Sequence, residues 1–301
     1  MPRAHVHIPP TAVFMIVGAV ACFSVLDGII KSLAVRHPVP LLVWARWGFQ
    51  VLAMLIWLAP SMGTRMLHTR QLRMQLLRGG LLVGSSLCFM TALAHMPLAD
   101  ATALNYTTPT IVIILAMVFL NERLTLPRMA FVIAGLAGMT MIVQPGAEIF
   151  RGTSLFALGS ALCYAIYQIT TRMLAGEDPR VSLFYPALVG TLLMTFVWPW
   201  FGSRIDLTWV DVVLLAGIGV IGTIGHFLFI LAFQRAPASA LTPFTYMQLV
   251  WAMLIGWLVF GDLPDGTSMA GMALIAGSGL LMAMVERRNV RAATHEPPAV
   301  D

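Results

Sequence analysis

The sequence predicts an all-α integral membrane protein of ten transmembrane helices, arranged as two inverted five-helix repeats. Three observations predict this fold: the composition, the number of long apolar stretches, and a similarity between the two halves of the chain. Of the 301 residues, 59% are hydrophobic and 10% are charged, and the mean hydropathy is +0.86. Soluble proteins carry about 25% charged residues, so this chain needs a lipid bilayer to cover its apolar surface.

Ten stretches of the chain are apolar over about 20 residues, the length that a helix needs to cross a bilayer. The first stretch has no signal-peptide cleavage site after it, so we expect it to remain as a helix. The connections are short, and none has room for a soluble domain. The expected spans are residues 11–33, 39–59, 75–96, 98–120, 126–144, 152–174, 181–201, 210–234, 237–260 and 267–285.

The Lys and Arg residues between the spans predict the orientation. If the N-terminus is cytoplasmic, thirteen of the 18 lie on the inner side, four lie on the outer side, and Arg46 lies within a span. Basic residues accumulate in cytoplasmic loops, so we expect a multi-pass inner-membrane protein with both termini in the cytoplasm. These loops account for the net charge of +5, and no nucleic-acid partner is expected. The expected organisation is a cytoplasmic segment 1–10, repeats at 11–144 and 152–285, and a disordered cytoplasmic tail at 286–301.

The second half of the chain resembles the first at an offset of about 140 residues, a spacing that indicates an internal duplication. Because each copy holds five spans, an odd number, the second copy is expected to enter the membrane from the opposite side. Inverted repeats are a hallmark of secondary transporters, although a duplication that only stabilises a bundle is the alternative. The matched residues are Gly18 with Gly159, Cys22 with Cys163, Lys31 with Arg172, Phe89 with Phe229, Ala92 with Ala232, Pro97 with Pro237, Thr102 with Thr242, Tyr106 with Tyr246, and Glu122 with Asp262.

Two segments resemble a known family. Residues 236–251, followed by Phe260-Gly261-Asp262, are similar to the second EamA-type domain of the drug/metabolite transporter superfamily, and residues 40–47 with 121–123 are similar to the first. The resemblance covers residues 11–285. It implies ten helices, a central cavity, and export or exchange of small metabolites such as amino acids or related compounds.

Two charged residues lie well inside the first two spans. Asp27 lies about 9 Å and Arg46 about 10 Å from the outer ends of their spans, at 1.5 Å per residue. Charges at this depth are costly unless they are paired or hydrated. One interpretation is an ion pair that joins the two helices, and the other is contact with a polar substrate or a proton. Lys31, one turn above Asp27, is close enough to the surface to extend toward water.

Polar side chains near the middle of the bilayer are further candidates for the cavity. Tyr106 and Tyr246 are repeat-related and lie about 12–14 Å inside their spans. Pro109 and Pro243 lie beside them and are expected to bend their helices. Two interpretations of polar residues at this depth remain open: hydrogen bonding between helices, or a substrate site at the repeat interface. Further members of the set are Asn105, Gln248 and Trp251.

Three further residues complete the set of candidates. His226 is a histidine far from either end of a span, so an interhelical hydrogen bond and proton coupling both remain open. Tyr164 and Gln168 lie on the sixth span and are either cavity residues or ordinary packing residues.

The sequence favours a secondary transporter for a small-molecule substrate over other membrane proteins. An intramembrane enzyme needs a nucleophile with a base, or a metal cluster, and we find neither at a recognisable spacing. The three cysteines lie in apolar stretches, so neither a disulfide framework nor a thiolate metal site is expected. No metal and no cofactor is expected for the function. The chain lacks the phosphate-binding loop of an ATP-driven pump. A passive channel or receptor remains as an alternative, but neither explains the duplication.

Overall fold

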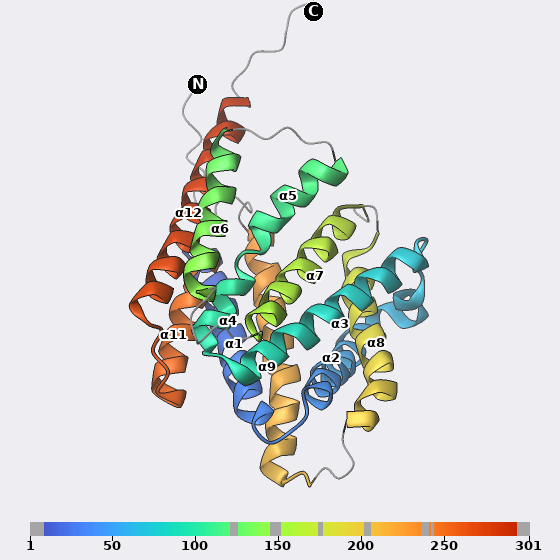
Figure 1. Cartoon of the computed structure of the whole chain (residues 1–301). Coiled ribbons are helices and arrows are strands. Elements are labelled where there is room, and N and C mark those ends of the chain that lie inside the picture. Colours follow the sequence, from blue (N-terminus) through green and yellow to red (C-terminus); the bar gives the residue numbers. More distant parts are fainter. Residues whose placement is uncertain are drawn as a thin grey trace, which may run out of the picture.

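The computed structural model describes residues 9–120, 126–144, 152–173, 177–201, 206–235, 241 and 244–293, and the regular elements within them are helices (Figure 1). The first half holds α1 (Pro10–Ala34), α2 (Val39–Met62), α3 (Leu72–His95), α4 (Leu98–Asn105), α5 (Thr108–Leu120) and α6 (Leu126–Val143). The second half holds α7 (Ser154–Met173), α8 (Pro179–Val197), α9 (Trp209–Arg235), α11 (Met247–Phe260) and α12 (Gly266–Ala293). Two short 3₁₀ helices, η1 (Gly63–Leu67) and η2 (Trp198–Phe201), follow α2 and α8.

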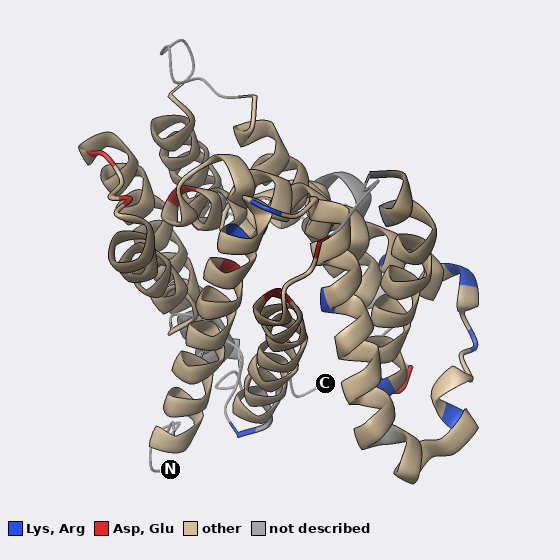
Figure 2. Ribbon diagram, turned by 90° about the horizontal axis from the view of Figure 1, so that it is seen from below, with Lys and Arg blue, Asp and Glu red and all other residues tan. Residues whose placement is uncertain are grey.

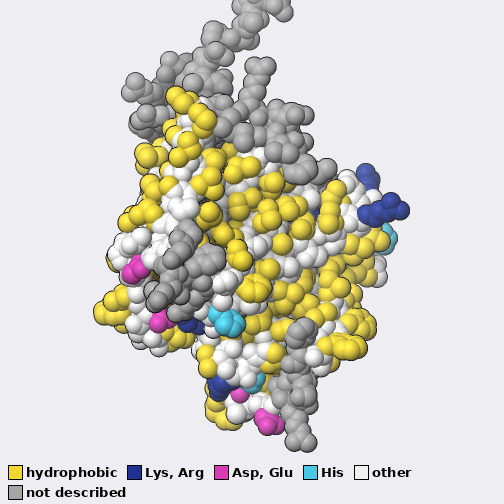
Figure 3. All heavy atoms as spheres, in the orientation of Figure 1, with side chains coloured by type: hydrophobic (Ala, Val, Ile, Leu, Met, Phe, Trp, Pro, Cys, Tyr) yellow, Lys and Arg dark blue, Asp and Glu magenta, His cyan; other side chains and the backbone are white. Residues whose placement is uncertain are grey.

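Eight helical segments are long and apolar enough to cross a membrane, which makes this a multi-pass membrane protein. A large apolar surface covers much of the face in Figure 3, and Figure 2 shows the charged residues as scattered positions on the ribbon. Two further apolar helices, Met129–Val143 and Met247–Phe260, are shorter than a full span. The all-helical fold is therefore confirmed, and the number of ten spans stays a prediction.

The fourth expected span, residues 98–120, is not one continuous helix but the two helices α4 and α5. Pro109 explains the break, because it has no N–H to donate to the Asn105 carbonyl and its ring crowds that carbonyl. The Asn105 carbonyl instead accepts a hydrogen bond from the Thr108 hydroxyl at 2.6 Å. The bend expected at Pro109 is present, and the bend expected at Pro243 lies outside the described residues.

The last helix is longer than expected. The expected span ends at residue 285 and a disordered tail follows, but α12 continues to Ala293. Residues 286–293 contain three Arg and two Ala residues, which have high helix propensity, so the helix extends beyond the apolar segment. The rest of the expected tail, residues 294–301, lies outside the described part of the chain.

Helices from the two halves pack in repeat-equivalent combinations. α1 packs on α9 and α7 on α3, α2 packs on α9 and α8 on α3, and α1 packs on α11 and α7 on α5. If each helix is replaced by its equivalent in the other half of the chain, the first contact of each pair becomes the second. The contacts of α2 with α8 and of α6 with α12 map onto themselves, and Figure 1 shows α6 and α12 side by side. This pattern of contacts is typical of two repeats related by a twofold axis.

The equivalence extends to single residues. Gly84 of α3 faces Cys163 of α7, and Gly225 of α9 faces Cys22 of α1; each residue of the first pair lies 141 positions from its equivalent in the second. A Cβ atom on Gly84 would lie 3.7 Å from Cys163 Sγ, and one on Gly225 would lie 3.2 Å from Cys22 Cβ. Small residues at these positions let the helix backbones approach closely.

Two loops also make contacts between repeat-equivalent positions, although the bonds differ. Arg36, which follows α1, pairs with Asp211 at the start of α9, and its Nη2 lies 3.1 Å from Asp211 Oδ1. Glu177 occupies the position equivalent to Arg36 and Arg70 the position equivalent to Asp211. The Arg70 backbone N–H donates to Glu177 Oε1 at 2.9 Å. In each repeat, the loop after the first helix therefore contacts the start of the third helix of the other repeat, α9 or α3.

Candidate functional site

A chain of polar side chains joins α1, the α4–α5 junction and α11 inside the bundle. Gln248, in the first turn of α11, donates from Nε2 to Oδ2 of the buried Asp27 at 3.4 Å. The Tyr106 hydroxyl contacts Gln248 Oε1 at 3.1 Å and the Thr245 carbonyl at 2.6 Å. A hydroxyl has one proton, so Tyr106 shares it between these two acceptors. Ser24, one turn from Asp27 on α1, donates to the Gln248 carbonyl at 3.3 Å.

The break between α4 and α5 positions Tyr106. The residue ends α4 with φ −71° and ψ 0°, and its ring lies 5.2 Å from the ring of Tyr246, at an angle of 41°. Tyr246 directly precedes α11. The structure therefore brings the repeat-related tyrosines into contact, one from each half of the chain.

Asn105 connects the same junction to the other half. Its Oδ1 accepts a hydrogen bond from Ser160 of α7 at 3.3 Å, and the hydroxyls of Ser160 and Ser85 of α3 lie 3.0 Å apart. Asn105 and its neighbour Tyr106 thus contact α7 and α11 of the second repeat, respectively. A polar network consequently crosses the interface between the two halves.

Arg46 lies in the same region but does not pair directly with Asp27. The ion pairs within the described residues do not include Arg46, although Asp27 acts on it electrostatically. Its Nε is enclosed and has no hydrogen-bond partner among the described residues. The guanidinium carbon lies 5.4 Å from the Trp47 ring centre. The structure therefore does not form the direct Asp27–Arg46 ion pair that was one of the two interpretations.

The remaining candidates make no hydrogen bond to Asp27, Gln248 or Tyr106 among the described residues. Tyr164 stacks on Tyr167 with ring centres 5.6 Å apart, and His226 packs on Phe23 with ring centres 4.9 Å apart. Gln168 is half-buried and makes no hydrogen bond within the described part of the chain. The enclosed indole Nε1 of Trp251 also has no described partner.

Arg78 is a buried polar residue of α3 and not, as expected from the count of basic residues, part of a cytoplasmic loop. It is 2% exposed, and its guanidinium donates to Thr171 Oγ1 at 3.0 Å, to Gln75 Oε1 at 2.9 Å and to the Tyr167 hydroxyl at 3.2 Å. Its position within the expected span 75–96 is the signal that would have identified it. Because its donors are paired, Arg78 fixes α3 to α7.

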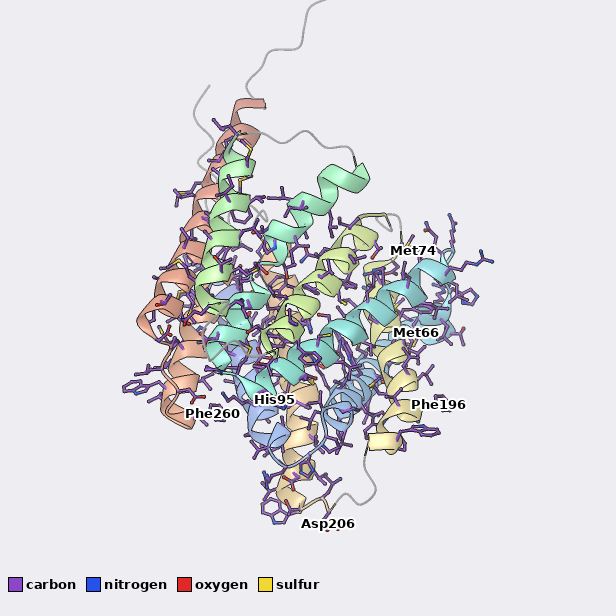
Figure 4. The ribbon with its side chains drawn as sticks, viewed as in Figure 1. Met66, Met74, His95, Phe196, Asp206 and Phe260 are labelled. Atoms are coloured by element: carbon purple, nitrogen blue, oxygen red, sulfur yellow. The ribbon has the colours of Figure 1, made fainter. Side chains whose placement is uncertain are left out.

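Lys31 extends from α1 to the segment between α11 and α12. Its Nζ lies 2.7 Å from Asp262 Oδ2, donates to the Met96 carbonyl at 3.0 Å, and lies 5.0 Å from the Phe260 ring centre. These contacts join α1 and the end of α3 to the segment between α11 and α12. Figure 4 shows Phe260 and His95, the last residues of α11 and α3, near the same end of the bundle, which we call the Lys31 end.

A small cavity of about 190 Å³ lies beside this end. Its lining includes Asp100, Gln144, Asp265 and Ser268. Asp265 accepts hydrogen bonds from the Ser268 backbone N–H at 2.6 Å and from Gln144 Nε2 at 2.8 Å. These bonds hold the pKa of Asp265 below its usual value. Asp265 therefore caps the start of α12 as a carboxylate.

The arrangement offers hydrogen-bond donors and acceptors to a small polar ligand. Among the described residues, no group of three or more His, Cys, Asp or Glu side chains is placed to hold a metal ion. The polar groups come from both halves of the chain and lie among apolar helices. Such an arrangement suits recognition of a solute within a membrane.

The model of the EamA-like transporter family matches this chain twice, at residues 10–144 and 152–284. An S-adenosylmethionine uptake transporter of Rickettsia conorii is 27% identical over 75% of this chain and 76% of its own length. A riboflavin transporter of Brucella anthropi is 27% identical over 88% and 96%. A pseudopaline exporter of Pseudomonas aeruginosa is 28% identical over 88% and 93%.

The fold is also found among solved structures. One crystal structure matches with a TM-score of 0.67 over 92% of this chain and 98% of its own, at 20% identity. At this identity the match shows a shared fold.

Proposed function

Since this chain belongs to the EamA-like transporter family, we propose that it is a secondary transporter that moves a small polar or amphipathic metabolite across the inner membrane by alternating access. Export or exchange is the proposed direction, and amino acids are one class within the proposed substrates. The similar proteins are named for S-adenosylmethionine, riboflavin and pseudopaline, and they include both uptake and export proteins. These names favour a transporter over an enzyme and leave the substrate to experiment.

The observation that best supports this proposal is the hydrogen-bonded chain of Asp27, Gln248 and Tyr106. It joins the first repeat to the second inside the bundle, where unpaired polar groups are costly. A ligand that forms hydrogen bonds with Gln248 and with Asp27 or Tyr106 contacts both repeats at once. Binding energy is then available to change the relation between the repeats, as alternating access requires.

The proposal includes ten spans in two inverted repeats, with both termini in the cytoplasm. The repeat-equivalent helix contacts support the twofold relation, and the odd number of spans per repeat then requires inversion. The basic residues of the loops support the orientation. In this orientation, the Lys31 end of the bundle faces the outside. Residues 11–144 and 152–285 are the proposed repeats.

We propose that the structure is closed at its Lys31 end. Gly28, one residue beyond Asp27, lies so near α11 that a Cβ atom on it would be 2.9 Å from Ile255. Above this contact, Lys31 pairs with Asp262. A route from Asp27 to the outside therefore requires α1 to separate from α11, and breaking the ion pair is one step of that separation.

Transport by the full chain in liposomes tests the proposal. Radiolabelled S-adenosylmethionine, riboflavin, amino acids and nucleosides are supplied outside vesicles that contain the same unlabelled compound. A carrier accelerates entry of the label by exchange, whereas a passive channel does not. The control is Arg36→Gln, which changes a loop ion pair away from the polar chain. No flux above empty vesicles for any compound, in either direction and with or without a pH gradient, would contradict the proposal.

A further inference from the structure

Arg46 is the charged side chain of the candidate site for which the described residues supply neither an ion pair nor a hydrogen bond. By contrast, Asp27 accepts from Gln248, and Lys31 pairs with Asp262. A guanidinium has five N–H donors, and an unpaired charged donor inside a membrane span is costly. An arrangement of this kind is favourable when a ligand supplies the missing acceptor.

The surroundings of Arg46 come from both repeats. The helix that carries Arg46, α2, packs on α1 of its own repeat and on α8 and α9 of the other repeat. The ring of Trp47 lies beside the guanidinium, with 5.4 Å between the guanidinium carbon and the ring centre. The charge therefore lies where helices of the two halves converge.

Packing does not require a charge at this position of the fold. The repeat-equivalent residue of Arg46 is Ala187 of α8, which is fully buried. The second repeat thus builds the same position with a small apolar side chain. The cation belongs to one half only, as expected for recognition of a ligand with different chemical groups at its two ends.

We propose that Arg46 binds a carboxylate of the transported metabolite, while Asp27 and Gln248 accept hydrogen bonds from donor groups elsewhere on it. This inference rests on the proposed transport function. A guanidinium fits a carboxylate because two parallel N–H groups meet its two oxygens. One Arg balances one negative charge, and the carboxylate of Asp27 nearby disfavours a doubly charged phosphate. The substrate class is therefore a metabolite with a single carboxylate and a separate donor group, such as an amine.

The test uses pairs of compounds that differ only in the carboxylate. S-adenosylmethionine is compared with decarboxylated S-adenosylmethionine, and phenylalanine with phenethylamine; riboflavin is the probe without a carboxylate. Binding to the purified full chain is measured by the ligand-induced rise in melting temperature, and transport by uptake into liposomes. The variants are Arg46→Gln and Arg46→Lys, and the matched control is Arg36→Gln at a half-exposed loop arginine.

We expect the wild type and Arg36→Gln to bind the carboxylate member of at least one pair about tenfold more tightly than its partner, equivalent to about 1.4 kcal/mol. Arg46→Gln should bring that ratio to about one. Arg46→Lys keeps the charge but loses the paired geometry, so it should lie between the two. If Arg46→Gln does not fold, the binding ratio of Arg46→Lys is compared with that of the wild type instead.

Two results would overturn the inference while leaving the proposed function intact. One is transport of a compound without a carboxylate, such as riboflavin, at a rate that Arg46→Gln does not change. The other is a preference for the carboxylate member that Arg46→Gln retains. Failure of the proposed function is a different result, because the wild type would then neither bind nor transport any of the probes.

Discussion

Replacing Lys31 by Gln should open the Lys31 end of the bundle more often. The substitution removes the ion pair with Asp262, and the weaker neutral amide replaces the ammonium that donates to the Met96 carbonyl. Hydrogen bonds to charged groups contribute about 1.5–3 kcal/mol when buried, and exposed ion pairs about 0.2–1 kcal/mol. The side chains of Lys31 and Asp262 are 14% and 38% exposed, so an intermediate value of about 1–2 kcal/mol applies. This raises the population of the open form about 5- to 30-fold.

Labelling of a buried cysteine measures this population without knowledge of the substrate. Ser24 is fully buried on α1 beside Gln248, so Ser24→Cys reports on access to the polar chain. The three native cysteines are first replaced by alanine, and right-side-out vesicles are treated with a membrane-impermeant maleimide. We expect Lys31→Gln to increase the labelling rate by the factor given above.

Two controls separate this effect from general destabilisation. Exchange of the charges, Lys31→Asp with Asp262→Lys, should return the rate toward that of the wild type. Arg36→Gln removes an ion pair with Asp211 instead. It should leave the labelling rate unchanged because the contact between α1 and α11 is not altered. The reasoning would be refuted by an unchanged rate in Lys31→Gln or by an equal increase in Arg36→Gln.

Three further predictions follow from other contacts. Tyr106→Ala and Tyr246→Ala should each lower liposome transport without lowering expression, because the repeat-related rings meet at the site; normal transport by both would remove them from it. Gly225→Val should destabilise the protein by about 1–3 kcal/mol, since a Cβ there lies 2.8 Å from Phe23, and thermal unfolding in detergent with no loss of stability would contradict this packing. Asp265→Ala should cost about 1 kcal/mol as loss of a helix cap. The native pKa of Asp265 is lowered, so this difference should be present above the unfolded pKa of about 4 and disappear as the pH falls through the native pKa; a difference that grows in acid would exclude the cap.

The helices follow from the sequence because apolar length is a local property. The first half shows this most clearly: α1 and α2 begin within one residue of their expected positions, and Pro109 identifies the break after α4. The end of α12 was missed because the end of an apolar stretch marks where a helix leaves the bilayer and not where it stops.

The polar pairs were harder to predict because they join distant positions. Lys31 and Asp262 are separated by 231 residues, and hydropathy does not reveal which loops meet. The repeat places Tyr106 and Tyr246 at equivalent depths, but equal depth alone does not predict that their rings meet. Asp27 and Arg46 also lie at similar depths, but depth does not specify the direction of a side chain. Depth therefore indicates which residues lie at one level of the bundle and not which of them form bonds.

Labelling from the two sides of the membrane tests the inverted repeat most directly. Arg36 and Glu177 are repeat-equivalent loop residues that make equivalent contacts with the other half. Cysteines introduced singly at these two positions, with the native cysteines replaced, are treated with an impermeant maleimide in right-side-out and in inside-out vesicles. We predict that position 36 reacts only from the outside and position 177 only from the inside. Reaction of both positions from the same side would contradict the inverted architecture and the transport mechanism built on it.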